Sequence, residues 1–143
     1  MNSLQLFLKS NSNSKKSSLL LVQWNCNYVL NKIPLLKDYL ERLKPDVMLL
    51  NEIKLEKGTA NFHLDFPGYI CISKERNSRG GGVAVLVRRE LDFVEDRSFD
   101  SLGMEIVAIK LKLSNRSISI IGLYNPPKDE LKTELFRILG GCG

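Results

Sequence analysis

The chain has 143 residues, of which 43% are hydrophobic and 26% are charged, and its formal net charge is +5. This length fits one domain with one core. No apolar run approaches the roughly 18–20 residues of a membrane-spanning helix, which excludes a transmembrane protein of that kind. A basic balance suits a polyanionic partner such as DNA, because Lys and Arg release counterions from phosphates.

The beginning of the chain and its cysteines indicate a cellular compartment. Residues 1–18 are rich in Ser, Asn and Lys, and we expect a disordered polar tail there. Its apolar patch Leu4–Leu8 is too short for a signal peptide. The widely spaced cysteines Cys26, Cys71 and Cys142 argue against a zinc site or a disulfide scaffold. These features predict a protein of the nucleus or cytoplasm that is not secreted.

Two apolar runs separated by a helical pattern open the domain that we expect over 19–143. Leu19–Gln23 and Asp46–Asn51 have the composition of buried strands. Between them, Asn31 can cap a helix that extends through about Leu43. A strand, a helix and a strand over this length predict a parallel pair of strands.

The remainder of the chain is predicted to be richer in strands than in helices. After a polar loop, the pattern predicts strands at Gly68–Ser73, Val83–Arg88, Glu105–Leu113 and Ser117–Leu123. Lys128–Leu139 is expected to form a closing helix with one apolar face. The fold class is therefore predicted to be α+β, with a mixed sheet and two main helices.

Two polar residues at predicted strand ends are candidates for a metal site. Glu52 ends a run that is otherwise apolar, and Asn25 follows the preceding strand. If the two strands are parallel neighbours, both side chains lie at the same end of the sheet. Mg²⁺ favours one or two carboxylates together with waters and phosphate oxygens. The alternatives are a solvated Glu at the start of a loop and an Asn that bonds its own backbone.

Two further features could contact a phosphate. Tyr124 follows a predicted strand and precedes Asn125-Pro126-Pro127, and a phenol at a sheet edge can donate to a phosphate oxygen. The alternative is an aromatic residue that is simply half-buried at the end of a strand. Lys74, Arg76 and Arg79 form the densest basic cluster, just before three glycines, and are candidates for nucleic-acid backbone contacts. A plain hairpin turn explains the glycines equally well.

Four phrases in one order carry a resemblance to a known family. They are Leu20-Leu21-Val22-Gln23-Trp24-Asn25, Pro45-Asp46-Val47-Met48-Leu49-Leu50-Asn51-Glu52, Arg79-Gly80-Gly81-Gly82-Val83-Ala84-Val85-Leu86 and Ile120-Ile121-Gly122-Leu123-Tyr124-Asn125-Pro126-Pro127. Together they resemble the N-terminal half of the endonuclease/exonuclease/phosphatase superfamily. The likeness is greatest to the endonuclease domain of jockey-type non-LTR retrotransposons.

The resemblance implies both a fold and an activity. The fold would be half of a four-layer α-β-β-α sandwich, and the activity Mg²⁺-dependent nicking of DNA, with Mn²⁺ as an alternative ion. Asn25 and Glu52 would hold the metal, and Tyr124 would assist at the phosphate. The implied partners are DNA, the C-terminal half of the domain and a reverse transcriptase domain.

The family's later motifs, a Gly-Asp-Phe-Asn phrase and a closing Asp-His pair, do not occur in this sequence. We therefore expect a truncated domain that is inactive by itself, in which one apolar face of the sheet lacks its partner sheet. Two alternatives remain open. One is a basic binding or interaction module that does not cut nucleic acid, and the other is a phosphatase of the same superfamily.

Overall fold

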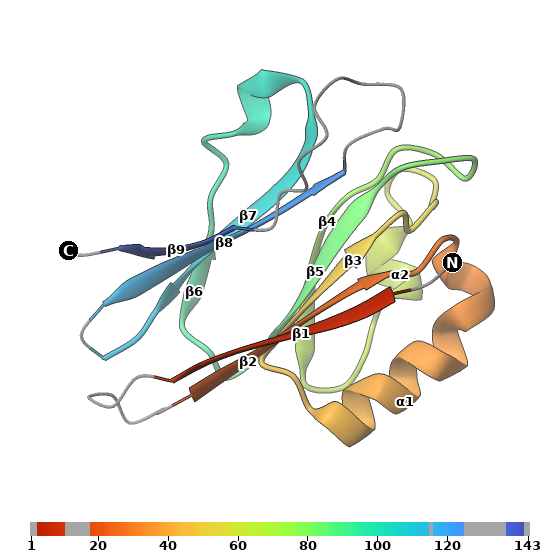
Figure 1. Cartoon of the computed structure of the whole chain (residues 1–143). Helices are drawn as coiled ribbons and strands as arrows, with labels where there is room; N and C mark the ends of the chain where they lie inside the picture. Colours follow the sequence, from red (N-terminus) through yellow and green to blue (C-terminus); the bar gives the residue numbers. More distant parts are fainter. Residues whose placement is uncertain (1–2, 11–17, 115, 125–136, 142–143) are drawn as a thin grey trace.

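The computed structural model describes residues 3–10, 18–114, 116–124 and 137–141, and two β-sheets packed face to face form its centre (Figure 1). The first sheet has the order β1 (Ser3–Ser10), β2 (Ser18–Asn25), β3 (Val47–Asn51), β5 (Val83–Arg88), β4 (Tyr69–Lys74). The second sheet has the order β6 (Phe93–Glu95), β7 (Glu105–Lys112), β8 (Ser117–Tyr124), β9 (Arg137–Gly141). The helical segments are η1 (Val29–Lys32), α1 (Ile33–Leu43), α2 (Ala60–His63) and η2 (Asp100–Leu102). The predicted α+β class is confirmed.

The strand pairing places the ends of β2 and β3 side by side. These strands are parallel neighbours, as predicted, and Asn25 pairs with Asn51 in their register. β5 then pairs antiparallel with both β3 and β4. Because parallel strands end at the same edge of a sheet, the residues that follow β2 and β3 meet there.

Helix α1 covers the outer face of the first sheet. Leu36 and Leu40, which are one helical turn apart, are buried against a cluster that includes Val22 and Trp24. The Trp24 ring meets Tyr39 edge-on, with a centroid distance of 5.1 Å. The helix ends where Lys44 adopts a left-handed conformation, just before Pro45. Within the described residues, no helix is long and apolar enough to cross a membrane.

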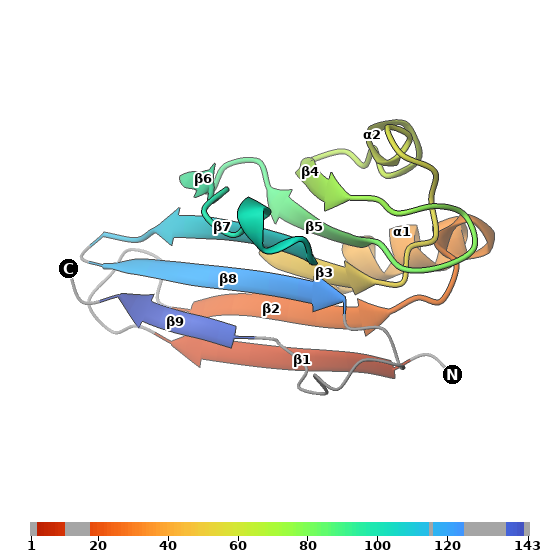
Figure 2. The same ribbon diagram turned by 90° about the horizontal axis from the view of Figure 1, so that it is seen from above.

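The inner face of the first sheet packs on the second sheet (Figure 2), so the expectation that this face lacks a partner sheet is wrong. Leu49 and Val85 from the first sheet, and Ile109 and Ile120 from the second, are each at most 1% exposed. Burying such a side chain contributes about 1.5–3 kcal/mol. The partner layer consists mainly of β7 and β8, which pair with each other in the second sheet and not with strands of the first. The sequence predicted the ranges of both strands but not their place in a second sheet.

Both ends of the chain differ from expectation. Ser3–Ser10 pairs with β2 as strand β1, where we expected a disordered tail, and its leucines at 4, 6 and 8 recur with the period of a strand. Most of the predicted closing helix lies outside the described residues. Its last residues, 137–139, belong to strand β9 and pair with β8, so the helix prediction is wrong there.

Candidate active site at one end of the sandwich

The predicted pair Asn25 and Glu52 is in contact. The Nδ2 atom of Asn25 donates a hydrogen bond of 3.3 Å to Oε2 of Glu52. Backbone bonds continue beyond the strand ends, from the N–H of Cys26 to the carbonyl of Asn51 and from the N–H of Tyr28 to the carbonyl of Glu52. The two segments after β2 and β3 therefore run together, and they present the amide and the carboxylate on one edge.

The backbone of these two segments adopts an unusual conformation. Asn27, Tyr28, Glu52 and Lys54 all have positive φ angles, between 43° and 81°. A non-glycine residue in this region typically costs about 1–3 kcal/mol, although Asn tolerates it best. Such residues gather at functional sites, where surrounding contacts hold them in place.

Asn51 connects this edge to the second sheet. Its Oδ1 accepts a hydrogen bond of 2.8 Å from Nε2 of Gln23, and its Nδ2 donates one of 3.3 Å to the carbonyl of Leu123. Tyr124 follows directly as the last residue of β8 and is half-buried against the core between the sheets. Tyr124 thus comes to the same end of the sandwich, but from the second sheet. The three candidate residues therefore come from two different sheets.

The glycine-rich turn before β5 also supports this end. The N–H groups of Ile53 and Lys54 donate to the carbonyls of Gly82 and Gly81, and the N–H of Gly82 donates to Oε1 of Glu105 at 2.6 Å. A Cβ atom at Gly81 would lie 2.6 Å from that same Oε1 atom. The glycines therefore permit a close approach between the segment after β3 and the second sheet.

Glu105 is a residue that the sequence analysis missed. It begins β7 and pairs in register with Tyr124 on β8, so it lies beside the candidate site. Nothing in its local sequence marks it, because its contacts come from a turn more than 20 residues earlier in the chain.

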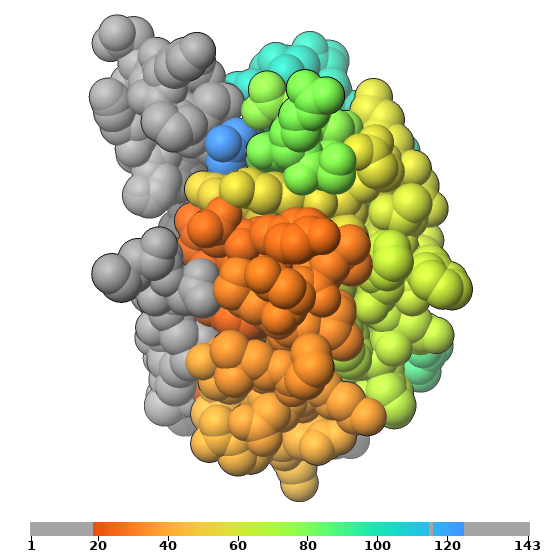
Figure 3. Space-filling view, turned by 90° about the vertical axis from the view of Figure 1, so that its right-hand side faces the viewer, coloured from red at the N-terminus to blue at the C-terminus, as the bar shows by residue number. Residues whose placement is uncertain are grey.

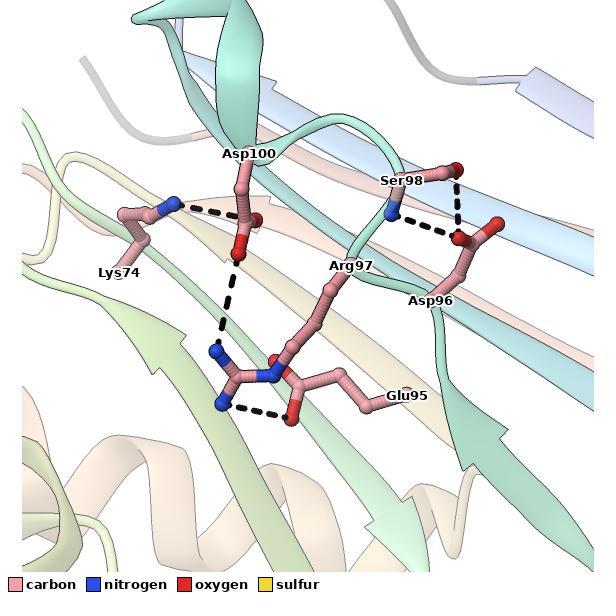
Figure 4. A network of polar contacts seen from close by, with 6 residues as sticks. All are labelled: Lys74, Glu95, Asp96, Arg97, Ser98 and Asp100. Carbon is pink, nitrogen blue, oxygen red and sulfur yellow. Dashed lines mark hydrogen bonds and ion pairs between the residues drawn. The ribbon is translucent and has the colours of Figure 1, made fainter.

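Two of the three basic residues that were predicted to contact nucleic acid lie beside a carboxylate of the protein. Lys74 Nζ lies 3.4 Å from Oδ1 of Asp100, within the polar network of Figure 4. Arg76 Nε lies 3.6 Å from Oε2 of Glu105. Arg79 is exposed in the glycine-rich turn. Contact of these three residues with nucleic acid stays a prediction.

The Glu52 carboxylate is the group best suited to a cation at this edge. Among the described residues, the Glu52 carboxylate accepts a hydrogen bond from Asn25 through Oε2, and its Oε1 atom accepts none. The Oδ1 atom of Asn25 accepts the N–H of Asn27 at 3.2 Å, so the amide orients the carboxylate. No group of three or more His, Cys, Asp or Glu side chains that could hold a metal occurs within the described residues. These donors fit a hydrated Mg²⁺ ion that keeps most of its waters.

Cys26 lies directly beneath this edge. Its side chain is buried, and its Sγ atom donates to the carbonyl of Asn51 at 3.3 Å. Burial disfavours the thiolate and raises the pKa of Cys26 from 9.0 to about 12. The thiol is therefore neutral at physiological pH and serves as a small core residue.

This shift predicts a specific loss of stability at alkaline pH. Between pH 9 and pH 10 the unfolded chain releases the Cys26 proton while the folded chain keeps it, so the free energy of unfolding falls as pH rises. The expected loss is about 1 kcal/mol. Urea denaturation of the wild type and of Cys26→Ala at both pH values measures it. An equal change in the two proteins would contradict a buried, neutral thiol.

Two face-packed sheets with a carboxylate and an amide at one end define an α+β protein with a candidate site for a divalent cation and phosphate. The model of the endonuclease/exonuclease/phosphatase family matches residues 22–139. The chain belongs to this family, as its motifs predicted.

Individual proteins that resemble this chain share only a low sequence identity with it. The chain is 23% identical over 122 residues to a protein described as a probable RNA-directed DNA polymerase from transposon BS of Drosophila melanogaster. That match covers 84% of this chain but 14% of the relative. Among solved structures, a 3′ phosphatase from Neisseria bound to a product DNA hairpin is 21% identical with a TM-score of 0.49, and an AP endonuclease from Archaeoglobus fulgidus is 21% identical with a TM-score of 0.47. The matches cover 74% and 73% of this chain, and 41% and 40% of those proteins.

Proposed function

We propose that this chain is the N-terminal portion of a metal-dependent DNA endonuclease domain from a non-LTR retroelement. The observation that carries the proposal is the contact between Asn25 and Glu52 at the ends of adjacent parallel strands. Family membership and the transposon relative support it. On this proposal the chain works in the nucleus or cytoplasm, and its partners are DNA and a reverse transcriptase domain.

Each residue of the site would have a separate task. Glu52 would bind the ion, Mg²⁺ or Mn²⁺, through its carboxylate, and Asn25 would orient that carboxylate and hold a metal-bound water. The chemistry that such an ion supplies is polarisation of a phosphoryl oxygen and activation of water. The phenol of Tyr124 would donate to an oxygen of the scissile phosphate. Asn51 would keep Tyr124 near Glu52 through the Leu123 carbonyl.

A single carboxylate is a weak site for a cation that dehydrates reluctantly. We therefore expect the 143-residue chain to bind Mn²⁺ weakly and to nick supercoiled plasmid DNA at no measurable rate. Glu52→Gln should abolish Mn²⁺ binding, followed by electron paramagnetic resonance. Asn25→Ala should weaken it by about tenfold, as loss of an orienting group does.

Glu41→Gln is the matched control, because Glu41 is exposed on α1 and is not part of the site. This variant should bind Mn²⁺ like the wild type. If Glu41→Gln and Glu52→Gln reduce Mn²⁺ binding equally, Glu52 does not form a metal site. Efficient nicking that Glu52→Gln abolishes would instead show that the chain is active by itself.

A further inference from the structure

Two lysines converge on one asparagine beside the candidate site. Lys32 Nζ donates to the backbone carbonyl of Asn27 at 2.7 Å, and Lys54 Nζ donates to Oδ1 of the same residue at 2.6 Å. Lys32 comes from the end of η1 and Lys54 from the segment after β3, so the backbone turns at both segments bring them together. Two ammonium groups are thus separated by a single asparagine.

The contacts of these lysines leave their charge unneutralised. Lys32 also contacts the carbonyl of Tyr28 and Oδ1 of Asn31, so each acceptor that the described residues provide to the two ammonium groups is a neutral oxygen. Among the described residues, neither lysine forms an ion pair. Lys74 and Arg76, in contrast, each lie within 4 Å of a carboxylate. Two half-buried cations in proximity repel each other, and an anion between them would relieve that repulsion.

The lysine pair is continuous with the candidate site. The N–H of Asn27 donates to the Asn25 amide, which in turn bonds Glu52. Asn27 is exposed, so the pair is open to solvent on that side. In Figure 3, the orange atoms of the segment after β2 and of α1, the yellow atoms after β3 and the green atoms of the glycine-rich turn lie side by side on this face.

We propose that Lys32 and Lys54, held together by Asn27, form a binding site for one phosphate group. Ammonium groups bind phosphate oxygens through charge-assisted hydrogen bonds, and two of them can contact one phosphate from two directions. Asn27 holds both side chains before binding and so lowers the entropy cost of ordering them. The proposal rests on the proposed function in one respect: the bound phosphate would belong to the DNA backbone and would lie next to the scissile phosphate.

The test measures DNA binding without metal. The full chain is titrated with a fluorescein-labelled 16-base-pair duplex in EDTA over a series of salt concentrations, and with inorganic phosphate while the Asn27 amide is followed by NMR. Lys32→Gln and Lys54→Gln should each lower the duplex affinity and reduce the slope of log K against log salt by about 0.9, the loss of one phosphate contact. Lys37→Gln and Lys57→Gln, which change exposed lysines, should leave the slope unchanged.

A second pair of variants keeps the geometry and changes the charge. Asn27→Asp retains the acceptor for Lys54 but places a negative charge between the two ammonium groups, so it should weaken binding as the lysine variants do. Asn61→Asp, at an exposed position of α2, is its control. Thermal unfolding of every variant identifies any that fail to fold.

The outcomes separate this inference from the proposed function. Duplex binding in EDTA does not involve a metal ion, so it can hold or fail independently of the Mn²⁺ binding that tests Glu52. A shift of the Asn27 amide by inorganic phosphate, without any effect of the lysine variants on duplex binding, would assign the site to a small phosphorylated ligand. If the lysine variants and Asn27→Asp behave like their controls with both probes, the site does not exist.

Discussion

Replacing Leu49 by alanine is expected to lower the free energy of unfolding by about 2–5 kcal/mol, a large share of the 5–15 kcal/mol that a domain typically has. Leu49 lies on β3 and is 1% exposed between the two sheets. Its Cδ2 atom would lie 2.8 Å from a Cβ atom at Gly122 of β8. The side chain thus spans the core to the opposite backbone, and its loss would leave a cavity that two hydrogen-bonded sheets cannot close.

A double-mutant cycle with Gly122 tests this packing directly. Gly122→Ala alone should be destabilising, because its methyl group would collide with Leu49. The same methyl group partly fills the cavity in Leu49→Ala, so the double variant should be more stable than the sum of the single changes predicts, with a coupling energy of about 0.5–3 kcal/mol. Urea denaturation gives all four free energies.

Val94→Ala provides the control, since Val94 lies on β6 of the second sheet and is 50% exposed, so its side chain is not part of the core. Its effect should stay within about 0.5 kcal/mol. If Leu49→Ala changes stability as little as Val94→Ala, the sheets do not pack as described. That result would restore the expectation of a single sheet with an uncovered apolar face.

The contrast between the sheets shows what the sequence can and cannot specify. The boundaries of β5 and β8 were predictable to within one residue, because apolar runs end at glycines, prolines or charged residues. Which sheet a strand joins depends on partners far away in the chain. The fully apolar run of β3 predicts burial on both faces, but its pattern does not say whether α1, β7 or nothing covers each face.

The residues of the candidate site likewise include some that could be placed from the sequence and others that could not. Asn25 and Glu52 could be placed together from sequence, because both follow runs typical of buried parallel strands. Tyr124 could be placed at the end of a strand but not on the second sheet. The roles of Asn27 and Lys54 depend on positive φ angles that no residue pattern there predicts, since neither position is a glycine.

The edge strands β1 and β6 could not be predicted from the sequence either. β6 has three residues, which is too few for any alternation to be recognised. β1 has the right period over Leu4–Leu8, but a polar surrounding of Ser, Asn and Lys favoured a tail. In both cases the pairing with a neighbouring strand, β7 for β6 and β2 for β1, defines the strand.

The second large effect is expected at Asp46, at the end of β3 opposite to the candidate site. Its carboxylate accepts the N–H of Leu20 at 2.8 Å and lies 3.5 Å from Nε of Arg88, and the side chain is only 6% exposed. Arg88 lies over the ring of Tyr69, whose hydroxyl donates to the carbonyl of Pro45. Asp46 therefore joins β2, β3 and β5 through one buried carboxylate.

Asp46→Ala should destabilise the protein by about 3 kcal/mol, because it leaves the partly buried Arg88 guanidinium without this partner and the Leu20 N–H without its acceptor. Asp46→Asn keeps an acceptor for Leu20 and should lose less. Asp46→Ala combined with Arg88→Met removes both charges and should recover part of the loss, since the cost of a broken buried pair lies mainly in the charge that remains. Urea denaturation of the three variants gives this order. A double variant less stable than Asp46→Ala would show that Arg88 stabilises the fold through Tyr69 and the Lys44 carbonyl, independently of Asp46.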